Sequence, residues 1–384
     1  MQYDLTEEQL LLQKTVRRIA KEKVAPGAGS RDESEEFDWD MVELLRENGF
    51  YGTDFPEAYG GSEAGMLALC IAIEELSKAD AATGLLLADQ ELGSLPVLLA
   101  ANESQRQRYL PQLAGGKLAA FALTESSAGS DVAQLRCRAV RDGDCYILNG
   151  TKTFITNGGV ADIITVYAVV DPDKPVHKNA AVFVVEKGTP GFSIGKREKK
   201  MGIRWSDTAE LIFDECRVPA ENLLGAEGQG FLIMMKTLDF SRPAVGAQAL
   251  GIASGAFEYA VAYAKERRAF GQPIIEHQGI AFKLADMAMR TEAARQLLYK
   301  TCALFQELPK DLSRVSSELI RMSSMAKCVC SDVAMWVTTE AVQVLGGYGY
   351  IREFPVERMM RDAKITQIYE GTNEIQRMVI ARTL

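Results

Sequence analysis

The amino-acid sequence predicts a multidomain α+β protein in which two helical regions flank a central region of strands. Residues 1–116 and 226–384 contain long amphipathic segments with helical spacing, whereas residues 117–225 contain short strand-like runs separated by Gly, Asn, Pro and Asp. The strands do not alternate with helices, which disfavours a doubly wound nucleotide-binding fold. We therefore expect three domains with these boundaries: an N-terminal helical domain, a central antiparallel β-barrel or sandwich, and a C-terminal four-helix bundle.

Composition narrows the classes of function. The chain has 384 residues, of which 25% are charged and 47% hydrophobic, with a net charge of −9. An acidic chain of this kind is not expected to bind nucleic acid. No apolar run is long enough to span a bilayer and no signal peptide is visible, so we expect a cytoplasmic protein without membrane insertion. The seven cysteines are scattered and only two histidines are present, which predicts reduced thiols and no metal site.

Capping residues and glycines mark the helices of the first domain. Thr6 has the character of an N-cap, and Asn102 is expected to cap a later helix. An amphipathic run over 38–48 ends at Gly49, and largely apolar runs over 66–77 and 83–99 predict buried helices.

The central domain is predicted from turn residues and short apolar runs. Asp142-Gly143 predicts a tight turn within 140–150, before a strand. The other expected strands cover residues 152–155, 162–169, 180–185, 191–194 and 209–213.

The C-terminal bundle is expected to contain long helices and one additional short helix. The amphipathic runs cover residues 231–238, 243–267, 278–304, 318–345 and 374–382. The connection 306–315, with Pro309 and two acidic residues, is expected to be an exposed loop.

The segment 361–377 contains the residue most suited to catalysis. Glu370 precedes Gly371, which breaks the helical pattern, and Thr372 can cap a new helix that has Glu374 in its first turn. One interpretation is purely structural, a helix end followed by a capped helix. The other is a carboxylate aimed into a cleft, with free backbone N–H groups beside it.

Four other polar clusters could bind a ligand, although each also has a structural interpretation as a cap, a strand edge, a solvated charge or a turn. No GxGxxG motif follows a strand, and two histidines disfavour a Ser/His/Asp or Cys/His triad. The clusters cover residues 124–131, 154–157, 266–271 and 343–349.

Taken in order, these motifs make the chain resemble the acyl-CoA dehydrogenase family over essentially its whole length. The matching segments are LTEEQ at 5–9, FPEAYGG at 55–61, FALTESSAGSD at 121–131, LNGTKTFITNG at 148–158, KMGIRWSD at 200–207, ERRAFGQPI at 266–274, HQGIAFKLADM at 277–287, VQVLGGYGY at 342–350 and RDAKITQIYEGT at 361–372. The resemblance implies the three-domain architecture above, with FAD between the β-domain and the bundle and reaching a neighbouring subunit. It further implies a homotetramer built as a dimer of dimers, and electron-transfer flavoprotein as the redox partner.

The resemblance also implies a role for each matching residue. Glu370 corresponds to the base that takes the α-proton of an acyl-CoA thioester while the β-hydrogen passes as hydride to flavin N5, giving the 2,3-enoyl-CoA. The implied cofactor-binding residues are Leu123, Thr124, Ser130, Phe154, Ile155, Thr156, Arg268, Phe270, Gln343, Gly346, Gly347, Thr372 and Glu374. The implied substrate-binding residues are Ser130, Asp239, Arg242 and Gly371.

Departures from the family pattern bear on specificity. Ser126 replaces the proline that commonly follows Thr-Glu in the flavin loop. Ser241 stands where some relatives place their base, and serine cannot do that work, so Glu370 remains the predicted base. No arginine lies near Thr83 to pair with a distal carboxylate, so we expect a short to medium straight-chain substrate rather than glutaryl-CoA.

Two alternatives remain open at this point. The same site would serve an enoyl-CoA reductase running the chemistry in reverse, and the chain could also be a non-catalytic acyl-CoA-binding member of the family. An oxidase is less favoured because such relatives often have longer chains. Acyl chain length and branching, the physiological direction and the electron acceptor are not determined by the sequence.

Overall fold

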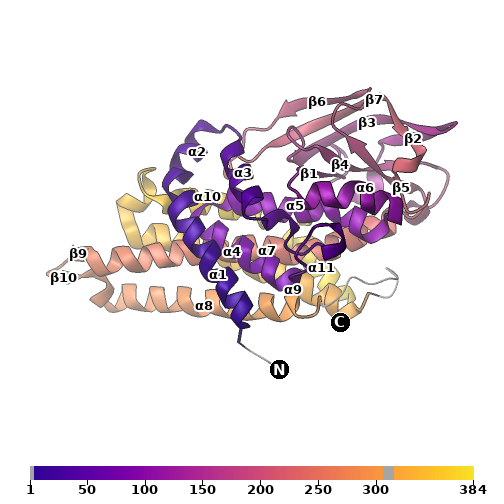
Figure 1. Ribbon diagram of the computed structural model, residues 1–384. Coiled ribbons are helices and arrows are strands. Elements are labelled where there is room, and N and C mark those ends of the chain that lie inside the picture. The colour runs from indigo at the N-terminus through magenta and orange to yellow at the C-terminus, as the bar shows by residue number, and fades with distance from the viewer. Residues whose placement is uncertain (1–3, 306–314) are drawn as a thin grey trace.

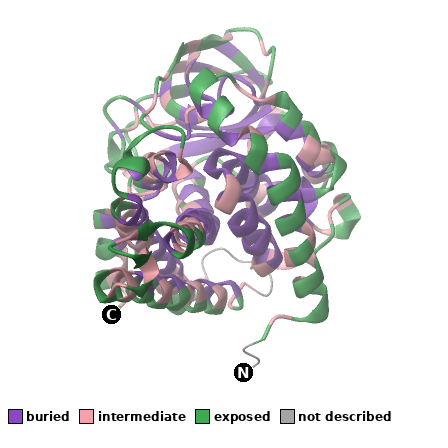
Figure 2. Cartoon of the chain, turned by 90° about the vertical axis from the view of Figure 1, so that its left-hand side faces the viewer, coloured by how far each residue is buried: buried purple, intermediate pink, exposed green. Residues whose placement is uncertain are grey.

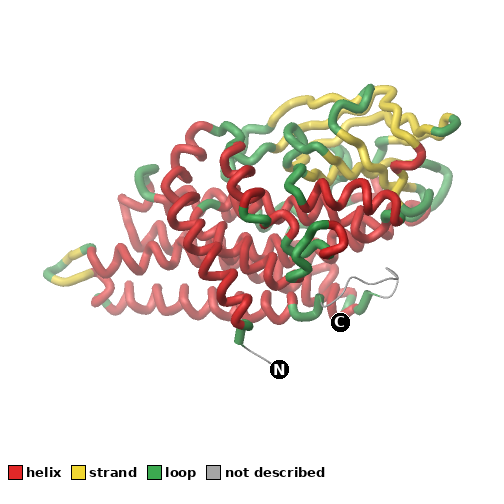
Figure 3. The backbone as a smooth tube through the Cα atoms, in the orientation of Figure 1, coloured by secondary structure: helices red, strands yellow, loops and turns green. Residues whose placement is uncertain are grey.

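The computed structural model describes residues 4–305 and 315–384 and has the predicted order of helices, strands and helices. Figure 1 shows the strands of the central domain gathered at one upper end of the molecule, and long helices running beneath them and away from them. Figure 3 shows the same division, with most strands in one region and a short two-stranded hairpin at the far left end of the long helices. The predicted exposed loop 306–315 lies almost entirely outside the described residues.

The N-terminal domain contains six α-helices in its described part. Thr6 and Asn102 are N-caps as predicted, and each forms a capping box with the glutamine three residues later. The sequence did not predict the π-turn over Ala20–Val24 or the 3₁₀ turn that follows it. The α-helices are α1 (Glu7–Ile19), α2 (Ala28–Ser34), α3 (Trp39–Glu47), α4 (Gly65–Ala79), α5 (Ala81–Ala100) and α6 (Glu103–Ala114).

The central strands form one sheet in the order β6-β7-β3-β2-β4-β5-β8, with β1 paired to β4 off this path. The pairing is antiparallel except between β1 and β4 and at one residue pair between β2 and β4. The predicted Asp142-Gly143 turn joins β2 to β3, and Gly143 has a φ of 64°. The strands are β1 (Ala119–Ala122), β2 (Arg138–Asp142), β3 (Cys145–Thr156), β4 (Ile163–Val169), β5 (Ala180–Glu186), β6 (Phe192–Arg197), β7 (Thr208–Pro219) and β8 (Leu223–Leu224).

One long helix replaces two that were predicted in the C-terminal region. The prediction that 231–238 and 243–267 are separate helices is wrong, because Pro243 lies inside α7 (Gly230–Glu266). Proline lacks the N–H that would bond the carbonyl four residues earlier. That carbonyl, on Asp239, instead accepts a hydrogen bond of 2.7 Å from Ser323 Oγ. The lost helical bond is therefore replaced by a tertiary one.

The remaining C-terminal elements surround α7. The predicted cap Thr372 accepts a hydrogen bond from the Ile375 backbone N–H, whereas the helix over residues 355–365 was not among the long helices predicted for the bundle. These elements are the hairpin β9 (Arg268–Ala269) and β10 (Gln272–Pro273), followed by α8 (Gln278–Cys302), α9 (Ser317–Leu345), α10 (Pro355–Ile365) and α11 (Asn373–Arg382).

The interior is built around helices from both helical domains. Every residue of α5 from Ala81 to Leu98 is buried, and Figure 2 shows buried segments in the centre with exposed helix faces outside them. Among the described residues one helical segment, Ser317–Tyr350, is long and apolar enough to cross a membrane by length and composition alone. Of its most apolar window, 56% is buried inside the molecule, as in a core helix.

Candidate active site

Glu370 lies in the short turn between α10 and α11, in a backbone conformation that is rare for a residue with a side chain. Its φ is 51°, and Gly371 follows with a φ of 91°. Left-handed backbone at a non-glycine residue costs about 1–3 kcal/mol and persists only where the surroundings hold it. Gln376 Nε2 provides part of that hold, because it donates to the carbonyl of Glu370 at 3.2 Å and to that of Gly371 at 2.9 Å.

Lys327 of α9 holds the same turn from the other side. Its ammonium donates to the Gly371 carbonyl at 2.9 Å and to Asn373 Oδ1 at 3.0 Å, and its side chain is fully buried. Burial lowers the pKa of Lys327 to about 8, against the opposing effect of the Glu370 charge. The sequence analysis missed Lys327, and its only signal there was a lysine within a largely apolar helical run.

The surroundings of the Glu370 carboxyl group raise the pKa of that group. Burial raises its pKa to about 7, while the hydrogen bond from Ser241 and the charges of Lys327 and Arg242 lower it. Ser241 Oγ of α7 donates to Glu370 Oε2 at 2.6 Å. In the part of the chain that the structure describes, no hydrogen bond has the Glu370 backbone N–H as its donor. The turn therefore combines a tuned carboxyl group with a free N–H donor.

Asp239 and Arg242, predicted to bind substrate, flank Ser241 on α7 as a buried ion pair. Arg242 Nη1 donates to Asp239 Oδ1 at 2.8 Å and to Ser324 Oγ at 3.0 Å. Arg242 Nε is buried and makes no hydrogen bond. Burial lowers the pKa of Arg242, and the Asp239 carboxylate opposes that effect. The pair thus lies in the same region as the carboxyl group of Glu370, but its two opposite charges largely compensate each other.

The predicted flavin loop and the 154–156 segment lie side by side. The Thr153 backbone N–H donates to the Thr124 carbonyl at 2.8 Å. A fully buried Lys152 ties the two segments further, because its ammonium donates to the Leu123 carbonyl at 3.0 Å and to Glu125 Oε1 at 2.7 Å. Five predicted residues, Leu123, Thr124, Phe154, Ile155 and Thr156, are therefore brought together at one place in the β-domain.

Phe154 differs from the rest of that group in its backbone conformation and its exposure. Its φ is 58° and its side chain is 64% exposed. A strained backbone that presents an aromatic ring outward is a feature expected where a ligand covers the ring. Ser130, at the end of the loop, is also exposed.

A second group of predicted cofactor residues lies elsewhere in the same chain. Arg268 and Phe270 belong to the β9–β10 hairpin, which projects from the bundle at the end opposite the sheet (Figure 1). Phe270 has a φ of 50° and is 97% exposed. Gly346 and Gly347 follow α9 and line a cavity of about 450 Å³ together with Arg267. The structure does not bring this group to the flavin loop of its own chain.

The glycine pair is shaped for a ligand. Gly346 has φ 62° and ψ −134°, a conformation open essentially to glycine alone. A Cβ atom at Gly346 or Gly347 would meet no heavy atom within 4 Å, so the space beside the backbone is open. Gln343 is exposed one turn earlier on α9. Thr372 is half-buried as the cap of α11, and Glu374 is exposed in its first turn.

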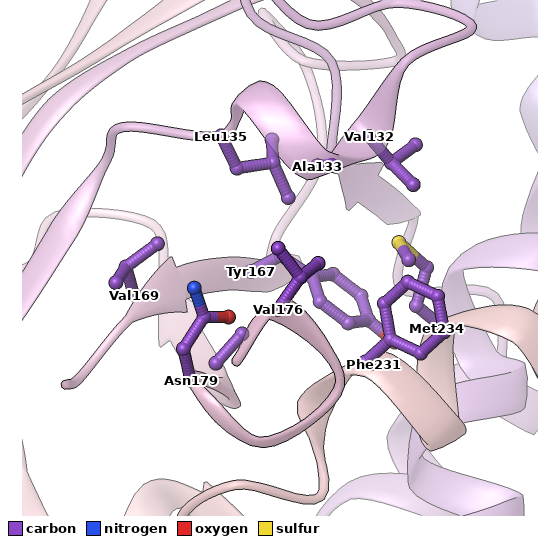
Figure 4. Close-up of a pocket in the computed structure, with 10 residues that line it drawn as sticks. Val132, Ala133, Leu135, Tyr167, Val169, Val176, Asn179, Phe231 and Met234 are labelled. Carbon is purple, nitrogen blue, oxygen red and sulfur yellow. The ribbon is translucent and has the colours of Figure 1, made fainter. Parts of the chain in front are cut away.

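A separate small cavity lies where the β-domain meets the start of α7. Figure 4 shows Leu135, Tyr167 and Phe231 among side chains that converge on it from loops, a strand and this helix. Its volume is about 10 Å³, about enough for a single water molecule. Across residues 4–305 and 315–384, no group of three or more His, Cys, Asp and Glu side chains is arranged to hold a metal ion.

Comparison with known proteins yields matches over the whole chain. Models of the acyl-CoA dehydrogenase N-terminal, middle and C-terminal domains match residues 6–117, 120–216 and 228–384. An acyl-CoA dehydrogenase of Bacillus subtilis (strain 168) is 47% identical over 382 residues, which are 99% of this chain and 98% of that protein.

Solved structures agree with these sequence matches. The butyryl-CoA dehydrogenase of Megasphaera elsdenii is similar with a TM-score of 0.95 at 46% identity, covering 100% of this chain and 99% of that one. A chain in the structure of the electron transferring flavoprotein of Acidaminococcus fermentans has a TM-score of 0.95 at 47% identity, with coverage of 100% and 99%. An acyl-CoA dehydrogenase complexed with FAD, from Bacillus anthracis, has a TM-score of 0.92 at 36% identity, with coverage of 99% and 67%.

Proposed function

The chain belongs to the acyl-CoA dehydrogenase family, and from that premise we propose that Glu370 is the base that takes the α-proton of an acyl-CoA thioester. The enzyme is an acyl-CoA dehydrogenase with FAD as its cofactor. The observation that carries the assignment of Glu370 is a half-buried side chain whose carboxyl group has a pKa of about 7, in a strained turn. A base with this pKa is half ionised near neutral pH, where an ordinary carboxylate would be too weak.

The turn also supplies a donor for the substrate. The backbone N–H of Glu370 is free, and Lys327 and Gln376 fix the two carbonyl groups beside it. A thioester oxygen bound to this N–H would gain negative charge as the α-proton leaves, and a fixed donor stabilises such charge without reorganisation. The same residue thus binds the carbonyl through its backbone and takes the proton through its side chain.

Ser241 keeps the Glu370 carboxylate in position between turnovers. Its hydroxyl donates to Oε2 at 2.6 Å, which leaves Oε1 as the oxygen to receive the proton. Because this hydrogen bond favours the ionised form, Ser241 also limits how far burial raises the pKa.

The residues of the chain fit FAD at two places. The exposed Phe154 ring lies beside the polar loop over 124–130, and the open backbone of Gly346 and Gly347 lines a cavity beside the Arg267 guanidinium. An aromatic ring system suits the first place, and a phosphate or a second ring system suits the second. FAD, when bound, supplies the acceptor for the electron pair and the β-hydrogen.

Assembly follows from the separation of these two places. The β9–β10 hairpin, which carries Arg268 and Phe270, lies at the end of the bundle away from the sheet (Figure 1), so we infer that these residues reach a flavin loop on another copy of the chain. We propose that two copies complete each FAD site and that two such dimers form a homotetramer, with electron-transfer flavoprotein receiving the electrons. A colourless monomer that cannot be reconstituted with FAD would contradict this arrangement.

The substrate is proposed to be a straight-chain acyl-CoA of short to medium length. The α5 helix beside the site carries Leu85, Leu86 and Leu92 and has no arginine, so a distal carboxylate would be buried without a cation. The decisive experiment is anaerobic bleaching of the flavin by butyryl-, hexanoyl-, octanoyl- and glutaryl-CoA. Bleaching by at least one straight-chain thioester is expected, whereas failure with all four would refute the proposed activity.

A further inference from the structure

Helix α9 carries a buried polar stripe beside the candidate active site. Ser323, Ser324, Lys327 and Ser331 recur at spacings of three and four residues, which places them on one face of the helix. Each of these side chains is fully buried. Polar side chains in such a position are costly unless they are hydrogen-bonded, so their partners show what the stripe holds in place.

The C-terminal part of the stripe holds the turn around Glu370. Lys327 donates to the Gly371 carbonyl at 2.9 Å and to Asn373 Oδ1 at 3.0 Å. The Asn373 side-chain amide in turn donates to Ser331 Oγ at 2.9 Å. Two residues of the stripe therefore fix the segment that follows Glu370.

The N-terminal part of the stripe holds the proline turn of α7, which we define as residues 239–243. Pro243 cannot donate to the carbonyl of Asp239, four residues earlier, and its ring crowds that carbonyl. Ser323 Oγ donates to the freed carbonyl at 2.7 Å. The backbone of the proline turn is therefore bonded to α9 at the point where the helical ladder is interrupted.

Ser241 lies in the middle of the proline turn. Its Oγ donates to Glu370 Oε2 at 2.6 Å, and the length of this hydrogen bond depends on where the turn places the hydroxyl. A second tie to α9 comes from Arg242, whose Nη1 donates to Ser324 Oγ at 3.0 Å. One face of α9 therefore holds both sides of the Ser241–Glu370 contact, the hydroxyl through the proline turn and the carboxyl group through the turn that follows it.

The bond made by Ser323 differs from the usual bond of a helical hydroxyl. Serine and threonine in a helix commonly donate to a carbonyl three or four residues earlier in the same helix. On α9 itself, Ser331 donates to the Lys327 carbonyl and Thr338 to the Ala334 carbonyl, each at 2.8 Å. Ser323 instead donates to another helix. Thr338, which is equally buried, is therefore a matched reference for it.

We propose that Ser323 is a positioning residue for the reaction, which fixes the proline turn through the Asp239 carbonyl and so holds the Ser241 hydroxyl at the Glu370 carboxylate. Its effect on the reaction passes through Ser241 alone. This inference rests on the proposed role of Glu370 and adds to it a residue from a third segment of the chain.

The pH dependence of flavin reduction in the holoenzyme tests the proposal, with the straight-chain acyl-CoA that bleaches the wild-type flavin fastest. Ser323→Ala removes the donor to the Asp239 carbonyl, so the Ser241 hydroxyl is expected to move away from Glu370. Because the hydrogen bond from Ser241 lowers the Glu370 pKa, the rise in rate is expected to move to higher pH. A shift of up to about one pH unit corresponds to the loss of one hydrogen bond. Thr338→Ala also removes a buried hydroxyl and is expected to keep the wild-type profile.

The Ser241→Ala background separates positioning from a general loss of stability. If Ser323 acts through Ser241, Ser323→Ala shifts the profile of the wild type but adds no further shift to Ser241→Ala. Thermal unfolding and flavin content show whether each variant keeps its fold. If Ser323→Ala does not fold with its flavin, Ser323→Cys decides by the same comparison, because it nearly keeps the volume and has a weaker donor.

The possible failures differ from one another. A pH profile of Ser323→Ala that matches those of the wild type and Thr338→Ala would overturn the role of Ser323 and leave the proposed function intact. Equal shifts in the wild-type and Ser241→Ala backgrounds would also overturn it, because the effect would then not pass through Ser241. A wild-type rate that does not rise with pH through about 7 would refute the role of Glu370 and this inference with it.

Discussion

Glu370→Gln isolates the proposed base with little change in shape. Glutamine can still accept the hydrogen bond from Ser241, which is 2.6 Å long in the wild type. The backbone contacts of Lys327 and Gln376 to the turn do not involve the Glu370 side chain. Binding of the thioester to the Glu370 N–H is therefore expected to survive, while proton abstraction fails.

The size of the loss follows from the surroundings of Glu370. A positioned general base typically contributes about two to four powers of ten in rate. Ser241 cannot replace it, and Glu374 is exposed on the next helix. We expect flavin reduction to slow by about four powers of ten or more, because neither of these groups can take the proton.

Anaerobic stopped-flow absorbance measures this loss directly. The variant is expected to stay yellow and to change its flavin spectrum on adding acyl-CoA, without bleaching on the wild-type timescale. Glu318→Gln, at an exposed position in the first turn of α9, is the control and is expected to bleach at the wild-type rate. Flavin reduction by Glu370→Gln within about tenfold of the wild-type rate would refute the assignment and favour the interpretation of this segment as a capped turn.

Three other changes test the remaining parts of the site. Because Glu370 must be ionised and its pKa is about 7, kcat/KM is expected to rise with pH through about 7. The hydrogen bond from Ser241 lowers the Glu370 pKa, so Ser241→Ala is expected to move this rise in kcat/KM to higher pH. A rise at the same pH as in the wild type would contradict the contact. Lys327→Met is expected to move the rise in kcat/KM to higher pH, because the Lys327 charge also lowers the Glu370 pKa. It is also expected to slow flavin reduction, because the Lys327 ammonium bonds the Gly371 carbonyl. A wild-type pH profile would count against that role. Arg268→Ala is expected to weaken FAD retention by about 1.5–3 kcal/mol, the value of a hydrogen bond to a charged group, with unchanged thermal unfolding of the apoprotein; flavin retained through gel filtration as in the wild type would rule out the contact.

The helices were predictable where their signals are local. Thr6, Asn102 and Thr372 cap helices in the structure because an N-cap acts within one turn of its own chain. The break expected before Pro243 was wrong for a non-local reason, since the freed Asp239 carbonyl is bonded by Ser323 from another helix. Strand β1 was missed because its sequence AAFA is short and fully buried and pairs in parallel with β4, so it shows neither alternation nor a hairpin turn.

The candidate site was predictable as a set of motifs but not as a geometry. The sequence predicted Glu370 as the base and a set of flavin-loop residues, and these roles remain predictions. It contained no sign that Ser241, 129 positions away, bonds the Glu370 carboxyl group, or that Lys327 holds the next carbonyl. It also could not predict left-handed backbone at Glu370, Phe154 and Phe270, because non-glycine residues adopt this conformation only when tertiary contacts enforce it.

These contacts explain why the turn around Glu370 is held by so many hydrogen bonds. A left-handed glutamate and a buried carboxyl group are each destabilising when taken alone. Ser241 partly satisfies the carboxyl group, and Lys327 and Gln376 bond the carbonyls of the turn. Fuller compensation at the carboxyl group, by a direct ion pair, would lower its pKa and weaken the base. Lys327 instead bonds the backbone and Asn373, so its charge acts on Glu370 without a direct bond. The stabilising hydrogen bonds therefore go to the backbone carbonyls of the turn, and the side chain keeps the pKa that its proposed chemistry requires.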